Sequence, residues 1–274
     1  MSGKLYVVGT PIGNLGDLSP RAVQVLGAVD CIAAEDTRVT VKLLNHFGIK
    51  TPLLSYHEHN KKAVGEKIVE RLLAGGTFAL VSDAGMPAIS DPGEDLVDLC
   101  HKRGIPVESV PGPSAVVTAL ALSGLPSGRF CFEGFLSVNK TSRRRHLEQL
   151  KNEPRTMVFY EAPHKLRATL EDMLAALGDR EIALVKEITK LHEQVHRTTL
   201  AQAVEYYAAH EPKGEYVLIL RSAPEALPAE YTPEQAAQIA RGYMEQGLSA
   251  SAAARAAAAD TGLKKGEIYK IITG

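Results

Sequence analysis

Five short apolar runs alternate with amphipathic stretches along the first 123 residues. Each run is too short for a helix and rich in aliphatic residues, so it predicts a β-strand, and each following stretch has helical periodicity. The first helix is marked by Ser19 as N-cap and Pro20 at the first helical position. Five strand–helix units in a row are typical of a parallel sheet that helices cover on both faces. The expected strands span residues 5–9, 31–35, 53–56, 78–83 and 106–112, and the last helix spans 113–123.

A second series of strands and helices follows with less regular spacing. The adjacent strands at 181–189 and 193–198 favour a partly antiparallel sheet. The other expected strands are 129–135, 155–162 and 215–221, with helices at 142–151, 163–177 and 199–209. The predicted fold class is therefore α/β, with a mostly parallel first domain at 1–122, a mixed second domain at 123–222 and a cleft between them.

The remaining residues differ in composition from this α/β body. The segment SAPEALPAEYTPE (222–234) is typical of a linker because it is rich in alanine and proline. Three short helical stretches follow, near 233–246, 249–259 and 264–272. We expect residues 223–274 to form a linker and a small helical element that resembles a helix-turn-helix.

Composition excludes several classes of protein. The chain of 274 residues is 45% hydrophobic and 23% charged, with a formal net charge of −1, which is typical of a globular protein and not of a generally basic nucleic-acid binder. Its three cysteines are far apart, so neither a zinc ribbon nor a disulfide framework is expected. The sequence shows neither a run of 18 apolar residues nor a signal peptide, and we expect a cytoplasmic protein without a membrane span.

The segment HEQVH (192–196) matches the H-E-x-x-H motif of zinc proteases. That motif needs a helix, but the tract alternates with period two, and the next helix is expected to start only after Thr199, with Gln202 completing a capping box. In a strand the two histidines would lie about 13 Å apart, too far for one metal ion. We interpret the match as accidental.

The glycines gather in three loops, each of which follows an expected strand. They are VGTPIGNLGDLS (8–19), VSDAGMPAISDPG (81–93) and VPGPSAVVTA (110–119). Such loops at the carboxyl ends of parallel strands let the backbone approach a ligand closely. The alternative is that they are only tight turns between strand and helix.

Seven segments in order resemble the motif series of the tetrapyrrole methylase superfamily. Within it they are most similar to the branch that methylates a cytidine ribose 2′-hydroxyl in small-subunit ribosomal RNA, and the resemblance spans essentially the whole chain. One departure is SDAGMP, where many relatives that modify tetrapyrroles read G-D-P. The segments are GTPIGNLGD (9–17), AAEDTR (33–38), LVSDAGMPAISDPG (80–93), PGPSA (111–115), FYEAPHK (159–165), KEITK (186–190) and KGEYVLIL (213–220).

The resemblance implies a two-domain α/β protein, commonly a homodimer, that binds S-adenosylmethionine in the cleft between its domains. Small-subunit ribosomal RNA, in the assembled subunit, is the implied substrate. The cofactor-binding positions that it implies are Pro11, Asp83, Ala84, Gly85, Met86, Ser114, Ala115, Tyr160, Glu161, Gly214 and Glu215.

Methyl transfer to a ribose hydroxyl needs a group that takes the hydroxyl proton as attack proceeds. Asp36 and Glu187 are the first candidates for this catalytic role, and Glu35 and Asp17 are further ones. The alternative for Asp36 is an N-cap, and for Glu187 it is an ion pair with a neighbouring lysine. The reaction requires no metal, and we expect no metal site.

Local basic patches predict contacts with RNA phosphates. The segment 139–155 has a surplus of four positive charges, and its three consecutive arginines suit bidentate phosphate contacts. The alternatives are a solvated helix face and, for the tail, a solubilising element. The predicted RNA-binding residues are Arg38, Arg143, Arg144, Arg145, Lys264 and Lys265.

Two other functions stay open at this point. One is a methylase of a small tetrapyrrole precursor, for which a basic tail has no obvious use. The other is a non-enzymatic RNA-binding protein of ribosome assembly.

Overall fold

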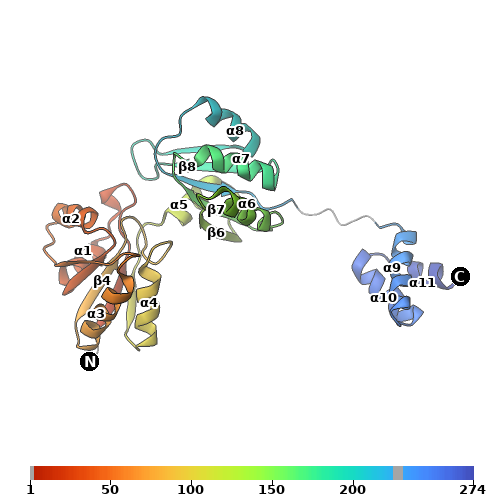
Figure 1. Cartoon of the computed structure of the whole chain (residues 1–274), viewed down its shortest axis with the longest axis horizontal. Helices are drawn as coiled ribbons and strands as arrows, with labels where there is room; N and C mark the ends of the chain where they lie inside the picture. The colour runs from red at the N-terminus through yellow and green to blue at the C-terminus, as the bar shows by residue number, and fades with distance from the viewer. Residues whose placement is uncertain (1–2, 225–230) are drawn as a thin grey trace. The chain divides into compact units, whose positions relative to one another are not determined.

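The chain forms two compact units, Met1–Ala223 and Pro224–Gly274. Figure 1 shows both in a computed structural model that describes residues 3–224 and 231–274. The first unit contains two five-stranded sheets, one parallel and one mixed, which confirms the predicted α/β fold class. The division of this unit into domains at residue 122 stays a prediction.

The first sheet is parallel, with the strand order β3-β2-β4-β1-β5. Strands β4 and β1 are neighbours in the middle of the sheet. The connection after β1 leads to β2 on one side of this pair, and the connection after β4 leads to β5 on the other side. The two connections therefore diverge at the carboxyl ends of β1 and β4. Ligands of open α/β sheets bind at such a reversal. The elements are β1 (Lys4–Val8), the 3₁₀ helix η1 (Leu15–Asp17), α1 (Pro20–Ala28), β2 (Cys31–Ala34), α2 (Thr37–His46), β3 (Leu53–Ser55), α3 (Lys61–Leu73), β4 (Thr77–Val81), α4 (Gly93–Lys102), β5 (Val107–Val110) and α5 (Ala115–Ser123).

Helices cover both faces of this sheet, as the continuous apolar strands predict. On β4, Phe78 and Leu80 pack in one cluster with residues of α3 and α4. Ala79 and Val81 point the other way and pack with residues of α1 and α2. The sheet is therefore a rigid base from which the loops at its carboxyl edge project.

The second sheet has the order β6-β7-β10-β8-β9. β6 and β7 are parallel, whereas β10 is antiparallel to both β7 and β8, and β9 is antiparallel to β8. Helices α6, α7 and α8 cover one face, and α5 packs on the other face through Val116 and Leu120. The elements are β6 (Phe130–Phe135), α6 (Lys140–Gln149), β7 (Thr156–Glu161), α7 (Leu166–Leu177), β8 (Glu181–Lys186), β9 (Gln194–Thr199), α8 (Leu200–Ala209) and β10 (Tyr216–Leu220).

The segment HEQVH is not helical. His192 lies in a turn, and His196 lies within β9, where it pairs with Leu184 of β8. Thr199 caps α8 by accepting a hydrogen bond from the backbone of Gln202, as predicted, but the Gln202 side chain accepts from Thr198 Oγ1 at 2.8 Å instead of completing the predicted capping box. The helix that a zinc protease of this type needs does not form here.

The second unit consists of α9 (Pro233–Glu245), α10 (Ala250–Thr261) and α11 (Lys265–Thr273). A capping box between Thr232 and Gln235 starts α9, and Gly262 ends α10 in the left-handed conformation. The small core is built mostly from alanines, which let the helices approach closely, together with Ile268. In the part of the chain that the structure describes, every helix is too short or too polar to cross a bilayer.

Candidate functional site

The three glycine-rich loops meet at the carboxyl edge of the first sheet. Thr10 of the first loop and Gly85 of the second form a β-bridge, with N–O distances of 2.9 and 3.1 Å. Gly9 of the first loop lies against Gly112 of the third, and a Cβ on Gly9 would be only 2.6 Å from the Gly112 Cα. No side chain fits between these backbones, which explains both glycines.

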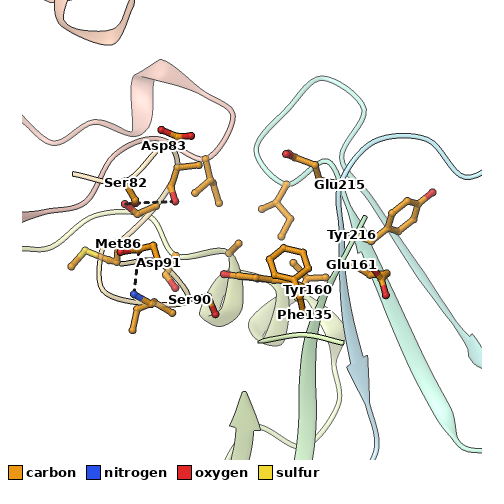
Figure 2. A pocket seen from close by; sticks show the side chains of 18 of the residues that line it. Ser82, Asp83, Met86, Ser90, Asp91, Phe135, Tyr160, Glu161, Glu215 and Tyr216 are labelled. Carbon is orange, nitrogen blue, oxygen red and sulfur yellow. Dashed lines mark hydrogen bonds between the residues drawn. The ribbon is translucent and has the colours of Figure 1, made fainter. Parts of the chain in front are cut away.

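A cavity of about 510 Å³ opens beside these loops. In Figure 2, Glu161 and Tyr216 of the second sheet, with the adjacent Glu215, lie on one side of it. The labelled residues of the second loop lie on the other side: Ser82, Asp83, Met86, Ser90 and Asp91. The volume is within the range of small-molecule sites. Of the eleven positions predicted to bind the cofactor, nine line it: Asp83, Ala84, Gly85, Met86, Ser114, Ala115, Tyr160, Glu161 and Glu215.

The other two predicted positions lie next to the lining. Pro11 precedes Ile12, which is a lining residue. Gly214 has a φ of +82°, and a Cβ there would be 2.6 Å from the Glu187 carboxylate. Gly214 therefore acts by letting the chain turn so that Glu215 faces the cavity.

Asp91 fixes the conformation of the longest loop. Its Oδ1 accepts hydrogen bonds from the backbone N–H groups of Ala88 at 3.0 Å and Gly93 at 2.7 Å. Ala88 and Ser90 have φ values of +67° and +63°, which are strained for residues with a side chain. The carboxylate thus holds a strained loop that forms one wall of the cavity.

Two carboxylates in the lining have unusual environments. Burial raises the pKa of Glu35, and the negative charges of Asp83 and Asp91 add to the effect. Burial also raises the pKa of Asp83, although a hydrogen bond from the Asp36 backbone N–H opposes it. Within the described residues neither carboxylate forms an ion pair, so both present negative charge to the cavity.

Asp36 does not line the cavity and has the role of a cap. Its Oδ1 accepts from the Arg38 backbone N–H at 2.8 Å at the start of α2, and its carboxylate pairs with the Arg38 guanidinium at 2.6 Å. The hydrogen bonds from Arg38 lower the pKa of Asp36 to about 2, which makes it a weak base. The catalytic role of Asp36 stays a prediction, but its place outside the lining and its lowered pKa favour an acid that lines the cavity.

Glu187 also lies outside the lining. Its Oε1 accepts from the Glu215 backbone N–H at 2.9 Å and from Lys190 Nζ at 3.0 Å. Burial alone would raise the pKa of Glu187, but these two hydrogen bonds lower it below its ordinary value. Glu187 thus braces the strand end that carries Glu215, and its catalytic role stays a prediction.

Several lining residues were missed in the sequence. Ser90 and Asp91 lie inside a glycine-rich segment and could have been found from it, whereas Phe135 and Tyr216 carry no local signal because strand pairing brings them here. Glu35 was considered but ranked below Asp36. The lining residues outside the predicted set are Ile12, Glu35, Ser82, Ile89, Ser90, Asp91, Phe135, Ala162, Pro163, Ile188, Tyr216 and Val217.

The structure separates the three consecutive arginines of α6. Arg143 is buried, pairs with Asp172 at 2.6 Å and donates to the carbonyl oxygens of Ser137 and Val138. Arg143 therefore offers little surface to an RNA phosphate, and its contact with RNA stays a prediction. Arg144 contacts the other oxygen of Asp172 but keeps an exposed side chain, and Arg145 is exposed.

The remaining predicted RNA-binding residues are on the surface. The Arg38 side chain is 88% exposed, although its guanidinium is shared with Asp36. Lys264 is exposed at the N-cap of α11, and the N-terminus of a helix favours an anion. Lys265 is half-buried and donates to Ser251 Oγ at 3.0 Å.

Known proteins match almost the whole length of this chain. A family model described as Tetrapyrrole (Corrin/Porphyrin) Methylases matches residues 4–204. A Synechocystis sp. protein named ribosomal RNA small subunit methyltransferase I is 47% identical over 271 residues, 98% of this chain and 97% of the relative. A Thermotoga maritima protein of the same name is 50% identical over 218 residues, 80% of this chain and 98% of the relative.

Solved structures agree with the fold. Uroporphyrin-III C-methyltransferase from Thermus thermophilus, complexed with S-adenyl homocysteine, has a TM-score of 0.55 and 21% identity over 80% of this chain and 97% of that chain. At this identity the likeness concerns the fold alone. The family match and the full-length relatives confirm the resemblance in the motifs, and this chain belongs to the tetrapyrrole methylase family.

Proposed function

We propose that this chain transfers the methyl group of S-adenosylmethionine to the ribose 2′-hydroxyl of a cytidine in small-subunit ribosomal RNA. The observation that carries the proposal is the cavity that the joined loops of the first sheet form with residues of the second. Relatives at 47% and 50% identity that are named as small-subunit ribosomal RNA methyltransferases support this choice of substrate.

The lining fits the charge and shape of S-adenosylmethionine. Ile12, Met86 and Ile188 offer apolar surface to an adenosyl group, while Glu35 and Asp83 offer negative charge to a cationic ligand. When bound, S-adenosylmethionine supplies a methyl group on a positively charged sulfur. The close backbone contact of the loops fixes their position before the ligand arrives, which lowers the cost of binding.

Glu35 is the residue that takes the hydroxyl proton in this proposal. It is the carboxylate at the end of β2 that faces the cavity. Its raised pKa makes it a stronger base than an ordinary glutamate, and stronger than Asp36 or Glu187, whose pKa values are lowered. Glu35 would accept the proton that the ribose 2′-hydroxyl gives up as it takes the methyl group.

Exposed basic side chains hold the RNA backbone. Arg144 and Arg145 project from α6, Arg38 lies two residues after Asp36, and Lys264 begins α11. Guanidinium groups suit bidentate phosphate contacts, which position an RNA without reading its bases.

The substrate in this proposal is the assembled small subunit, and the protein acts as a cytoplasmic homodimer. The assembled subunit is favoured because the basic side chains come from several short segments of the chain, and a pre-folded RNA surface offers phosphates to all of them at once. Light scattering of the purified protein checks the dimer.

Methyl transfer distinguishes this function from its alternatives. Labelled S-adenosylmethionine is incubated with the protein and either small ribosomal subunits from unmodified cells or uroporphyrinogen III. We expect label in the ribosomal RNA alone. Label in the uroporphyrinogen would favour a tetrapyrrole methylase, and binding to subunits without transfer would favour an assembly protein.

A further inference from the structure

Phe135 is an aromatic residue that the fold leaves exposed on the wall of the cavity. It is the last residue of β6, lines the cavity beside Tyr160 and is 57% exposed. Figure 2 shows the two side chains between the labelled residues of the second loop, such as Asp91, and Tyr216. A phenylalanine normally gains stability from burial, so this exposure calls for an explanation.

A β-bulge directs Phe135 toward the cavity. The register of β6 against β7 shifts between Phe132 and Gly134, so that Phe132 pairs with Val158 and Phe135 with Tyr160. The shift means that β6 has one more residue than β7 at this point. Without that extra residue, side-chain alternation would put Phe135 on the opposite face of the sheet from Phe132. Gly134 has a φ of +65°, which the bulge requires. Bulges beside functional sites commonly re-aim a side chain in this way.

Neighbouring groups fix the plane of the Phe135 ring. Lys165 Nζ lies over it, 5.4 Å from the ring centroid, and is held there by Glu161 at 3.0 Å. The Tyr160 ring lies 5.3 Å away at a tilt of 56°, and Tyr160 in turn packs edge-on against Phe132. The ring is therefore positioned in advance, with much of its surface open to a ligand.

We propose that the base of the accepting nucleotide stacks on Phe135. The inference rests on the proposed function, because a ribose 2′-oxygen enters a cavity only when its nucleotide leaves the RNA stack. Proteins hold such splayed bases by stacking them on aromatic side chains. Stacking does not depend on the identity of the base, so Phe135 contributes to binding and to the position of the ribose, not to the choice of cytidine.

Substitution of Phe135 tests the inference, with Phe130→Ala as the matched control. Phe130 is on the same strand and partly exposed, but it is not among the residues that line the cavity. For methylation of small subunits, we expect Phe135→Ala to lower kcat/KM by about 10- to 100-fold and Phe135→Trp to keep it within about 3-fold. Phe130→Ala should retain wild-type activity, and the calorimetric affinity of Phe135→Ala for S-adenosylmethionine should be unchanged.

A second substrate isolates the contact with the base. Small subunits are reconstituted with an abasic ribose at the accepting position, which keeps the 2′-hydroxyl but removes the base. Wild type and Phe135→Ala should then methylate this substrate with equal kcat/KM, because the stacking partner is gone.

The outcomes separate the two proposals. An active wild type with an equally active Phe135→Ala variant overturns the stacking inference alone. The stacking inference also fails if Phe135→Ala weakens cofactor affinity as much as it lowers kcat/KM, or if its defect persists on the abasic substrate. A wild type that transfers no methyl group to ribose overturns the proposed function and this inference with it.

Discussion

Glu35 and Asp36 are neighbours in the chain, but the fold places their carboxylates in different environments. Glu35 faces the cavity, whereas Asp36 caps α2 and pairs with Arg38. The sequence indicates that an acidic residue follows the second strand, but it does not say which of the two side chains points inward. That choice depends on where β2 ends, and a shift of one residue reverses it.

Replacing Glu35 tests its role as proton acceptor. We expect Glu35→Gln to lower kcat for subunit methylation by about 10²- to 10⁴-fold, the usual contribution of general base catalysis. Asp36→Asn is the matched control and should retain most of the activity, because an asparagine side chain can still cap α2. Equal activity of Glu35→Gln and wild type would contradict the assignment.

The pH profile gives an independent check. Only ionised Glu35 accepts a proton, and burial raises its pKa above the ordinary value of 4.5. Wild-type kcat should therefore rise with pH through a pKa above 4.5 and then level off. The residual activity of Glu35→Gln should lack this rise. If the variant keeps the same pH profile as the wild type, the titrating group is a residue other than Glu35.

At the scale of elements, the close approach of the first and third loops is the feature on which the cavity depends. A Cβ on Gly9 would lie 2.6 Å from Gly112 Cα and 2.7 Å from Met86 Sδ. We expect Gly9→Ala to lower the free energy of unfolding by about 1–3 kcal/mol and to weaken S-adenosylmethionine binding, measured by calorimetry. Gly27→Ala in α1, where an added Cβ meets nothing within 4 Å, should leave binding unchanged.

Helix α6 separates a structural arginine from a surface one. Arg143→Ala leaves the buried Asp172 with Arg144 as its remaining partner. We expect the free energy of unfolding, measured by denaturant titration, to fall by about 3 kcal/mol. Arg145→Ala should leave stability unchanged and reduce the slope of log K against log salt for subunit binding by about one. An unchanged slope would remove Arg145 from the RNA contact.

Hydrophobic periodicity predicted the positions of the helices and strands, but the sequence predicted only part of the residues that form the site. The three glycine loops were recognisable because each follows a strand that ends in a glycine-rich turn. The bulge at Gly134 and the burial of Arg143 could not be recognised in the sequence. Both depend on partners that are distant along the chain, Tyr160 and Asp172. Local pattern finds the loops, whereas tertiary contacts select the residues that face the ligand.

At the scale of the whole molecule, the α/β unit that holds the cavity and the C-terminal helical unit differ in composition and form separate compact units. The unit from Pro224 to Gly274 has its own core, and a relative 50% identical to this chain matches only 80% of it while covering 98% of its own length. The α/β unit should therefore keep its fold and its cofactor site alone.

Truncation after Ala223 tests this division. We expect unchanged cofactor affinity and a raised KM for small subunits, because Lys264 and the N-terminus of α11 are lost as phosphate contacts. A KM equal to that of the full chain would show that the helical unit has no part in RNA binding.

The most direct test of the central claim is the chemical position of the transferred methyl group. Ribosomal RNA labelled by the protein with radioactive S-adenosylmethionine is hydrolysed completely in alkali, which cleaves an RNA chain only next to a free 2′-hydroxyl. We predict that the label appears in an alkali-resistant dinucleotide whose first residue is cytidine. Label in single nucleotides would place the methyl group on a base and contradict the account.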